Sequence, residues 1–323
     1  MSELDSLAGN ALLASITRMA LRVLSVKLST PTLRVAAIGD LSPLSRVAEI
    51  LTSDSQFPVQ LKYFGAESSQ YVKSYAEFSP QAFDCVLVIA EDLNAENRLL
   101  GQVGLADKTS PQIVRWQKYL RGALGALQIP GPLPTCLNYE KLFALSAALF
   151  FAPSSGPVLE CGVFQGGTTV FLARLQRELG LSREILAFDT FQGLPAPVKQ
   201  DFEVPGETYP AGFFGETSLD GVLKLYEQHT VRQDIRVCQG LVGDTLPLAL
   251  QGKACSFALL DMDQYMGTHQ ALEIILRNCQ SGTLIIVDDT SISGVNRAIE
   301  EACAIRPLVR RLITGNFDLL AIT

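Results

Sequence analysis

The pattern of apolar and polar positions is most regular after residue 135, where short apolar runs alternate with amphipathic segments. The apolar runs predict strands at 157–161, 184–189, 235–239, 256–261 and 283–288, and the amphipathic segments predict helices at 139–150, 167–179, 219–228, 268–278 and 294–304. Alternating strands and helices are typical of a parallel sheet covered by helices. The end differs, because the runs at 308–314 and 317–322 flank Gly315-Asn316, which favours a tight hairpin turn. We therefore predict an α/β fold whose mostly parallel sheet ends in an antiparallel β-hairpin.

The N-terminal part of the chain shows a shorter pattern of the same kind. Apolar runs at 33–38, 59–64 and 83–90 predict strands, and 43–52 predicts a helix, so we expect a small Rossmann-like module. Its turn glycine, Gly39, is followed by Asp40 and not by a second glycine. No phosphate-binding loop is therefore indicated, and a structural or recruiting role is favoured.

A helix is predicted ahead of this module. Leu12, Ile16, Met19, Val23 and Val26 recur three or four residues apart and form one apolar seam. The seam either packs on its own domain or makes a dimer contact, and a homodimer is our expectation.

Three parts follow from these patterns. We expect residues 1–110 to form the N-terminal helix and the small α/β accessory domain. Residues 111–134 are helical and then rich in proline, which indicates a connection. Residues 135–323 form the main domain.

Composition narrows the class of protein. The 323 residues are 48% hydrophobic and 18% charged, with a net charge of −7, so nucleic acid and anionic membranes are not expected as partners. No transmembrane helix or signal peptide is predicted, because Pro153 to Pro157 interrupts the longest uncharged run and the chain begins with acidic residues. The seven cysteines form no C-x-x-C pair, which favours reduced thiols and a cytoplasmic location.

The first predicted strand of the main domain leads into a glycine-rich turn. Glu160, Gly162, Gly166 and Gly167 lie in this turn, and Asp189 ends the next strand. Glycines let the backbone approach a bulky ligand, and an acid at the second strand suits ribose hydroxyls. This pattern predicts a nucleoside site without separating S-adenosylmethionine from a dinucleotide, although the E-C-G-x-x-x-G-G spacing is unlike G-x-G-x-x-G. Glycines that serve only strand–helix packing are the structural alternative.

Two later strands end in paired acids. Asp261 and Asp263 follow one strand, and Asp288 and Asp289 follow the next. Acids placed so close together repel unless a cation neutralises them, and hard divalent cations prefer carboxylate oxygens. We expect a metal-type site in the same crevice as the nucleoside site. The alternative is that Asp288 and Asp289 only cap the following helix.

Other residues are candidates for contact with a substrate. The 190–217 loop carries Tyr209, Phe213 and Phe214 among glycines and prolines and is long enough to form a lid that excludes water. Tyr139, Tyr265 and His269 lie near predicted site segments and are further candidates, with packing or capping as the alternative roles.

Five blocks of the main domain resemble the macrocin O-methyltransferase family over residues 135–323. They are LECGVFQGG at 159–167, FDTFQGLP at 188–195, GLVGDTLP at 240–247, LDMDQY at 260–265 and VDD at 287–289. The resemblance implies a Rossmann-like class I methyltransferase domain that uses S-adenosylmethionine and Mg²⁺ to methylate sugar hydroxyls in natural-product biosynthesis. Met262 departs from the family pattern, which has Gly there, so the identity of the acceptor stays open.

The resemblance also implies a role for each matching residue. Asp261, Asp288 and Asp289 would bind Mg²⁺, and Asp263 would be the general base. The cofactor would contact the matching blocks at Glu160, Gly162, Val163, Phe164, Gly166, Gly167, Thr168, Asp189, Thr190, Gly243, Asp244 and Asp261.

We therefore expect methyl transfer to a hydroxyl of a small-molecule acceptor with adjacent oxygens, such as a sugar or a vicinal diol. Two alternatives remain at this point. Asp261-Met262-Asp263 is also a D-x-D segment, of the kind that holds a metal and a nucleotide sugar in glycosyltransferases. A non-catalytic scaffold that binds S-adenosylmethionine is the other alternative.

Overall fold

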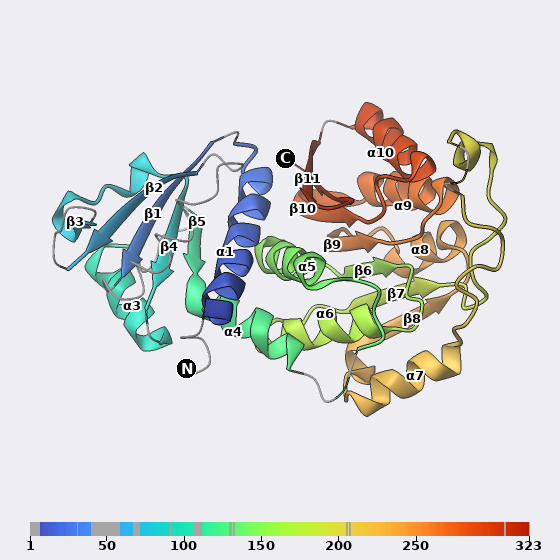
Figure 1. Ribbon diagram of the computed structural model, residues 1–323, viewed down its shortest axis with the longest axis horizontal. Coiled ribbons are helices and arrows are strands. Elements are labelled where there is room, and N and C mark those ends of the chain that lie inside the picture. The colour runs from blue at the N-terminus through green and yellow to red at the C-terminus, as the bar shows by residue number, and fades with distance from the viewer. Residues whose placement is uncertain are drawn as a thin grey trace. The chain divides into compact units, whose positions relative to one another are not determined.

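The structure is a computed structural model that describes residues 7–30, 32–39, 59–66, 72–90, 92–105, 112–128, 131, 133–204, 206, 208–306 and 308–322. The chain divides into two compact units, Met1–Leu124 and Gly125–Thr323 (Figure 1). The predicted helix at 43–52 and Asp40 lie outside the described residues. Among the described helices, none combines the length and the hydropathy needed to cross a membrane. All seven cysteines are described and are free thiols.

The first unit is built on a parallel five-stranded sheet in the order β3-β2-β1-β4-β5. Its elements are α1 (Leu7–Lys27), β1 (Leu33–Gly39), β2 (Val59–Gly65), β3 (Val72–Ser74), β4 (Cys85–Ile89), α3 (Leu93–Gln102), β5 (Gln112–Arg115) and α4 (Trp116–Leu127), whose last residues belong to the second unit. The three predicted strands are confirmed as β1, β2 and β4. The short strands β3 and β5 were not predicted.

The apolar seam of α1 is buried within the chain. Ile16, Met19, Val23 and Val26 are each at most 4% exposed. Their burial is the packing expected of an amphipathic helix in a single chain. A homodimer therefore stays a prediction that this seam does not support.

The second unit carries a seven-stranded sheet in the order β11-β12-β10-β9-β6-β7-β8. Its strands are β6 (Val158–Cys161), β7 (Ile185–Asp189), β8 (Ile235–Gln239), β9 (Cys255–Leu260), β10 (Cys279–Val287), β11 (Val309–Thr314) and β12 (Phe317–Ala321). The helices are α5 (Tyr139–Phe151), α6 (Gly167–Glu178), α7 (Leu219–Gln228), α8 (Val242–Leu250), α9 (Tyr265–Arg277) and α10 (Ser293–Ile305). β12 pairs antiparallel with both β10 and β11, and the other pairs are parallel. The predicted α/β fold with a closing antiparallel hairpin is confirmed.

Alternate residues of the central strands pack against the helices on one face of the second sheet. Leu159 and Cys161 of β6 pack in one apolar cluster with side chains of α8, α9 and α10. β6 and β9 are buried at every position, as expected for central strands of a parallel sheet. Helix α8 was not predicted, since Pro247 lies inside it, and α9 begins at Tyr265, three residues before its predicted start.

The turn after β6 is set by one close backbone approach. Gly162 has φ +95, and a Cβ there would collide with the backbone carbonyl of Asp261. Only glycine both adopts this conformation readily and leaves room for the neighbouring strand end. The turn and the acids after β9 are therefore in direct backbone contact.

We predict that Gly162→Ala destabilises the second unit more than Gly180→Ala does. Gly180 also has a positive φ, +65, but a Cβ there meets nothing within 4 Å, so it controls for backbone strain alone. The extra collision should lower the free energy of unfolding by about 1–3 kcal/mol more. Urea unfolding followed by fluorescence measures the difference, and equal losses in the two variants would contradict this account.

Candidate active site

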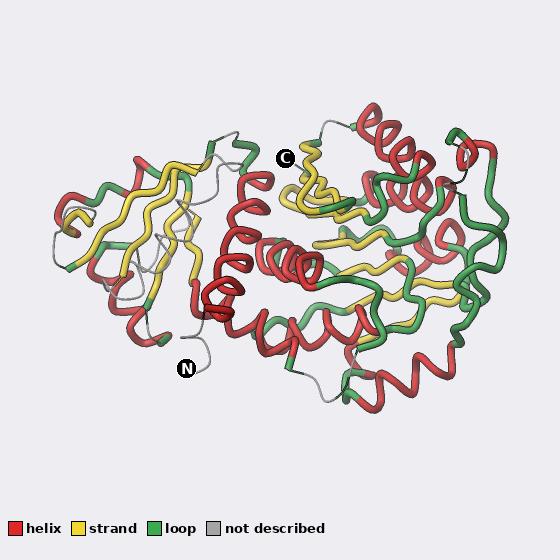
Figure 2. Tube along the Cα trace, in the orientation of Figure 1, coloured by secondary structure: helices red, strands yellow, loops and turns green. Residues whose placement is uncertain are grey.

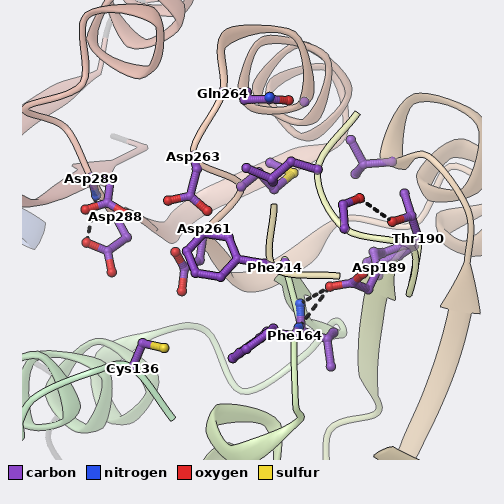
Figure 3. A pocket seen from close by; sticks show the side chains of 18 of the residues that line it. Cys136, Phe164, Asp189, Thr190, Phe214, Asp261, Asp263, Gln264, Asp288 and Asp289 are labelled. Atoms are coloured by element: carbon purple, nitrogen blue, oxygen red, sulfur yellow. Dashed lines mark hydrogen bonds between the residues drawn. The ribbon is translucent and has the colours of Figure 1, made fainter. Parts of the chain in front are cut away.

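A cavity of about 320 Å³ opens where β6, β7, β9 and β10 end, as expected for the carboxyl edge of a parallel sheet (Figure 3). The predicted site residues that line it are Gly162, Val163, Phe164, Thr168, Asp189, Thr190, Tyr209, Phe214, Asp261, Asp263, Asp288 and Asp289. The structure thus brings the predicted nucleoside turn and the paired acids to one cavity.

Asp189 holds the turn that follows β6. The backbone N–H groups of Val163 and Phe164 donate to Asp189 Oδ2 at 2.8 and 2.9 Å, and that of Phe191 donates to Oδ1 at 2.7 Å. Phe164 and Phe191 both have left-handed backbone conformations, which this carboxylate helps to fix. Because a carboxylate has further lone pairs, the predicted contact of Asp189 with a ribose remains open to it.

Glu160 lies behind the turn and not on the cavity wall. It is 1% exposed, and its Oε2 is a buried oxygen for which the described residues supply no hydrogen-bond partner. Burial raises the pKa of Glu160 to about 8, against the effect of a hydrogen bond with Thr169. Tyr226 donates to Thr169 Oγ1 at 2.8 Å, so this acid belongs to a buried polar group that supports α6.

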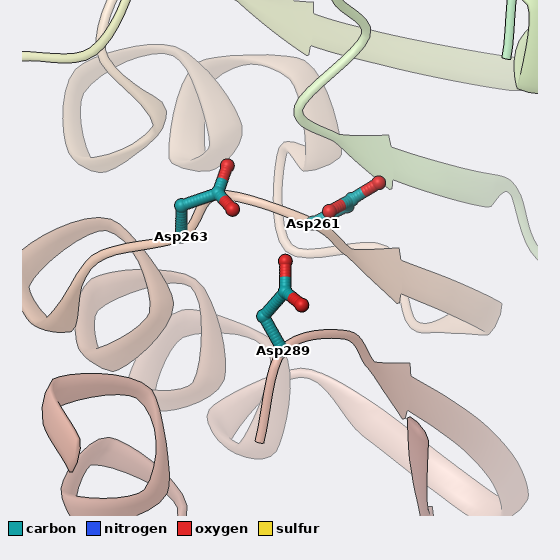
Figure 4. Close-up of side chains that lie close together, drawn as sticks. All are labelled: Asp261, Asp263 and Asp289. Carbon is teal, nitrogen blue, oxygen red and sulfur yellow. The ribbon is translucent and has the colours of Figure 1, made fainter. Parts of the chain in front are cut away.

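Three acids converge at the other end of the cavity. Carboxylate oxygens of Asp261, Asp263 and Asp289 all lie within 4.8 Å of one another (Figure 4). Burial and the neighbouring carboxylates raise the pKa of Asp261 well above its usual range and that of Asp263 to about 9. Such a set fits a hard divalent cation, which prefers carboxylate oxygens and would favour the ionised forms of these acids.

The fourth acid, Asp288, has a different partner. Lys141 Nζ lies 2.5 Å from Asp288 Oδ1, and the same oxygen accepts the backbone N–H of Asp289 at 2.7 Å. Burial raises the pKa of Asp288, while the lysine opposes this shift. The structure therefore places Asp263 with Asp261 and Asp289, and Asp288 with a cationic side chain.

The closing hairpin reaches the acids as well. Asn316 at its tip donates its side-chain N–H to Asp289 Oδ1, and the Asn316 carbonyl accepts from the backbone and the hydroxyl of Thr290 at 3.0 Å each. Asp289 has φ +54 and Asp263 has φ +58. Both acids thus sit on backbone held in a sparsely populated conformation by surrounding contacts.

The segment between β7 and α7 is a long loop, in which Lys199–Phe202 form a short 3-10 helix (Figure 2). The two ends of this loop meet at Leu194, Gly212 and Phe213, which we call the neck. There the Leu194 N–H donates to the Phe213 carbonyl, and the Leu194 carbonyl accepts from the backbone N–H of Gly212, both at 2.8 Å. Beyond the neck, Phe214 packs edge-on against Phe164 with ring centroids 5.4 Å apart. The loop therefore supplies an aromatic wall to the cavity, and its movement as a lid stays a prediction.

Asp201 anchors this loop to the metal-type site. It is 2% exposed, and its Oδ1 accepts the backbone N–H of Tyr265 at 2.6 Å, at the first residue of α9. The N-cap residue of α9, Gln264, makes no side-chain cap and instead donates to the carbonyl of Pro195 at 3.0 Å. A loop carboxylate thus caps the helix that directly follows Asp263.

Several predicted contact residues lie outside the cavity wall. Tyr265 donates to Glu301 Oε2 at 2.7 Å, and His269 stacks on its ring and lies 3.4 Å from the same oxygen. Tyr139 is 68% exposed at the start of α5, and Phe213 stacks on Tyr209. The other residues placed outside the wall are Gly166 and Gly167, at the start of α6, and Gly243 and Asp244, in the first turn of α8.

Other lining residues were not predicted. Lys141, Cys136 and Gln264 line the cavity, and Asn316 and Asp201 hold its acids and its loop. Cys136 and Lys141 precede the resembling blocks, so no motif marked them. Burial of a charged side chain is the signal that would have found Asp201 and Lys141, and it is visible only in three dimensions.

The architecture resembles that of known methyltransferases. The structure of the O-methyltransferase NovP superposes with a TM-score of 0.50 at 19% identity, over 64% of this chain and 89% of that one. This likeness defines the fold as that of a Rossmann-like methyltransferase. The model of the TylF family of macrocin O-methyltransferases matches residues 148–314, more than half of the chain. The chain therefore belongs to the TylF family, as its sequence blocks predicted.

Two curated relatives each match 45% of the chain. The 4′-O-methyltransferase for 8-demethyl-8-(2,3-dimethoxy-alpha-L-rhamnosyl)-tetracenomycin C from Streptomyces olivaceus is 29% identical over 150 residues, 45% of this chain and 57% of that protein. The mycinamicin III 3″-O-methyltransferase from Micromonospora griseorubida is 27% identical over 152 residues, 45% of this chain and 59% of that protein. The matched segment spans less than two thirds of each relative.

We predict that the stability of the fold falls less with rising pH in Glu160→Gln than in the wild type. Because the folded-state pKa is about 8 against an ordinary 4.5, the stability that protonated Glu160 contributes is complete below about pH 4.5 and is lost as the pH rises through about 8. The amide keeps the shape without ionising. Thermal unfolding in EDTA at pH 5, 7 and 9 should show that Tm declines less with rising pH in Glu160→Gln than in the wild type. Glu227→Gln, at an exposed helix position, is the control. An unchanged decline would refute a buried, protonatable Glu160.

We predict that Asp201→Asn loosens the acid site without removing any of its acids. Losing a charge-assisted hydrogen bond at the start of α9 should cost about 1–3 kcal/mol of stability and weaken the binding of divalent cations. Unfolding and Mg²⁺ titration measure the two effects. Glu203→Gln is the matched control, since Glu203 lies in the same loop but is an exposed partner of Arg297. Identical behaviour of the two variants would remove Asp201 from this role.

Proposed function

We propose that this protein transfers a methyl group from S-adenosylmethionine to a hydroxyl of a sugar-like or vicinal-diol acceptor, with the help of a divalent cation such as Mg²⁺. The proposal rests on one observation: the turn held by Asp189 and the carboxylates of Asp261, Asp263 and Asp289 line a single cavity. Membership of the TylF family supports O-methylation. The names of the relatives, which act on sugar-bearing natural products, support the acceptor class.

The described residues suit S-adenosylmethionine. Gly162 lets the turn approach a ligand, and Phe188, Leu241 and Val242 offer apolar surface on the same cavity. The carboxylates of the cavity complement a sulfonium cation. We assign the nucleoside to the β6–β7 side and the acceptor to the side of the acids.

The chemistry requires a better nucleophile than a neutral hydroxyl. Bound Mg²⁺ would supply positive charge that lowers the pKa of an acceptor hydroxyl. Asp263 is the group to which we assign removal of the hydroxyl proton, because its carboxylate faces the cavity beside Asp261 and Asp289. Tyr209 and Phe214 exclude water from the reacting groups, and the turn and the acids hold the two substrates in line.

The glycosyltransferase interpretation of Asp261-Met262-Asp263 has less support. The TylF model matches residues 148–314, so both acid pairs lie inside the part of the chain that places it in a methyltransferase family. Isothermal titration with S-adenosylmethionine, with and without Mg²⁺ and EDTA, tests the proposal directly. Binding of a UDP-sugar with metal, and none of S-adenosylmethionine, would reverse the choice. Binding of S-adenosylmethionine without any metal effect would favour a scaffold.

We predict that Asp263→Asn lowers turnover about 10²–10⁴-fold, as expected for loss of a general base. Affinity for S-adenosylmethionine should stay near wild type, because the nucleoside is assigned to the opposite side of the cavity. Methyl transfer to a panel of glycosylated acceptors and titration of the cofactor measure the two effects. Asp220→Asn, at an exposed position in α7, is the control and should be silent. Full activity of Asp263→Asn would exclude Asp263 as the base.

A further inference from the structure

The acid site contains a cationic side chain in addition to its carboxylates. Lys141 Nζ lies 2.5 Å from Asp288 Oδ1, and the two side chains are only 15% and 3% exposed. The ammonium also lies 5.3 Å from the centroid of the Phe317 ring. The pair is therefore a shielded contact on the cavity wall, where charges interact more strongly than at an open surface.

The position of Lys141 is unfavourable without these carboxylates. Asn138 caps α5 by accepting the backbone N–H of Lys141 at 3.0 Å, so the lysine lies in the first turn of the helix. The helix dipole repels a cation at that end, and burial removes water from the ammonium. The acids offset both costs, which makes the lysine part of the site's charge balance.

Lys141 also divides the four acids. The ammonium and the backbone N–H of Asp289 both occupy Asp288 Oδ1, whereas Asp261, Asp263 and Asp289 turn their oxygens toward one another. Lys141 precedes residues 148–314, the segment that the family model matches. The lysine is thus a feature of this chain outside the matched motifs.

We propose that the ammonium of Lys141 competes with the divalent ion for Asp288 and thereby sets the affinity of the site for that ion. This inference rests on the cation dependence in the proposed function. Lys141 acts through Asp288 and is a positioning residue, not a catalytic one. Without a divalent ion, the ammonium neutralises part of the acid cluster and supports the fold. With one, it keeps Asp288 from binding at full strength.

The test is the binding of Mg²⁺ and Mn²⁺ to the full chain by isothermal titration, together with Tm in EDTA. Lys141→Met should tighten cation binding about tenfold or more, because a unit positive charge beside the site is lost and an oxygen of Asp288 is released. It should also lower the Tm of the cation-free protein. Lys141→Arg should stay close to wild type, and Lys224→Met, at an exposed position in α7, is the control.

A double-mutant cycle separates this role from general packing. In an Asp288→Asn background, Lys141→Met should tighten cation binding less than it does in the wild-type background, since only the loss of the positive charge remains and no oxygen of Asp288 is released. If the wild-type protein binds the cation and folded Lys141→Met binds it equally or more weakly, the inference is overturned and the proposed function still stands. Binding that appears only in Lys141→Met would support it. No cation binding by either protein would overturn both the inference and the proposed cation.

Discussion

Four carboxylates meet where β9 and β10 end, and their mutual repulsion is the constraint on which the rest of the site depends. Two neighbouring side chains offset part of this repulsion, and a third fixes the helix beside the acids. Lys141 pairs with Asp288, Asn316 donates to Asp289, and Asp201 fixes the helix that follows Asp263. These partners come from α5, the closing hairpin and the long loop. The acids therefore hold together parts of the second unit that are far apart in sequence.

Much of this unit could be predicted from the sequence because the information is local. The buried run at 255–260 and the amphipathic helix at 219–228 carry their periodicity in consecutive residues, and Gly315-Asn316 marks its own turn. The topology of parallel sheets then places strand ends at one edge. That rule alone was enough to bring Asp189, Asp261 and Asp288 to a single cavity.

What could not be predicted depends on contacts across long separations. Lys141 and Asp288 are 147 residues apart, and Asp201 and Tyr265 are 64 apart. No periodicity links such pairs. Sequence also did not show which carboxylates would face one another, since the left-handed backbone at Asp263 and Asp289 decides this. The short strands were not predicted for another reason: β3 has three residues and β5 four, too few to show an alternation of apolar and polar positions.

The neck at Leu194 and Phe213 has a consequence for how this fold can diversify. Two backbone hydrogen bonds close the loop there, so the chain between 195 and 212 leaves and returns at one place, and within it Tyr209 packs against Phe214 of the aromatic wall. Lengthening a closed loop costs little chain entropy. Added residues at exposed positions of this loop, away from Asp201 and Tyr209, should therefore leave the wall beside Phe164 in place, so that the rim of the cavity can change while its floor is kept.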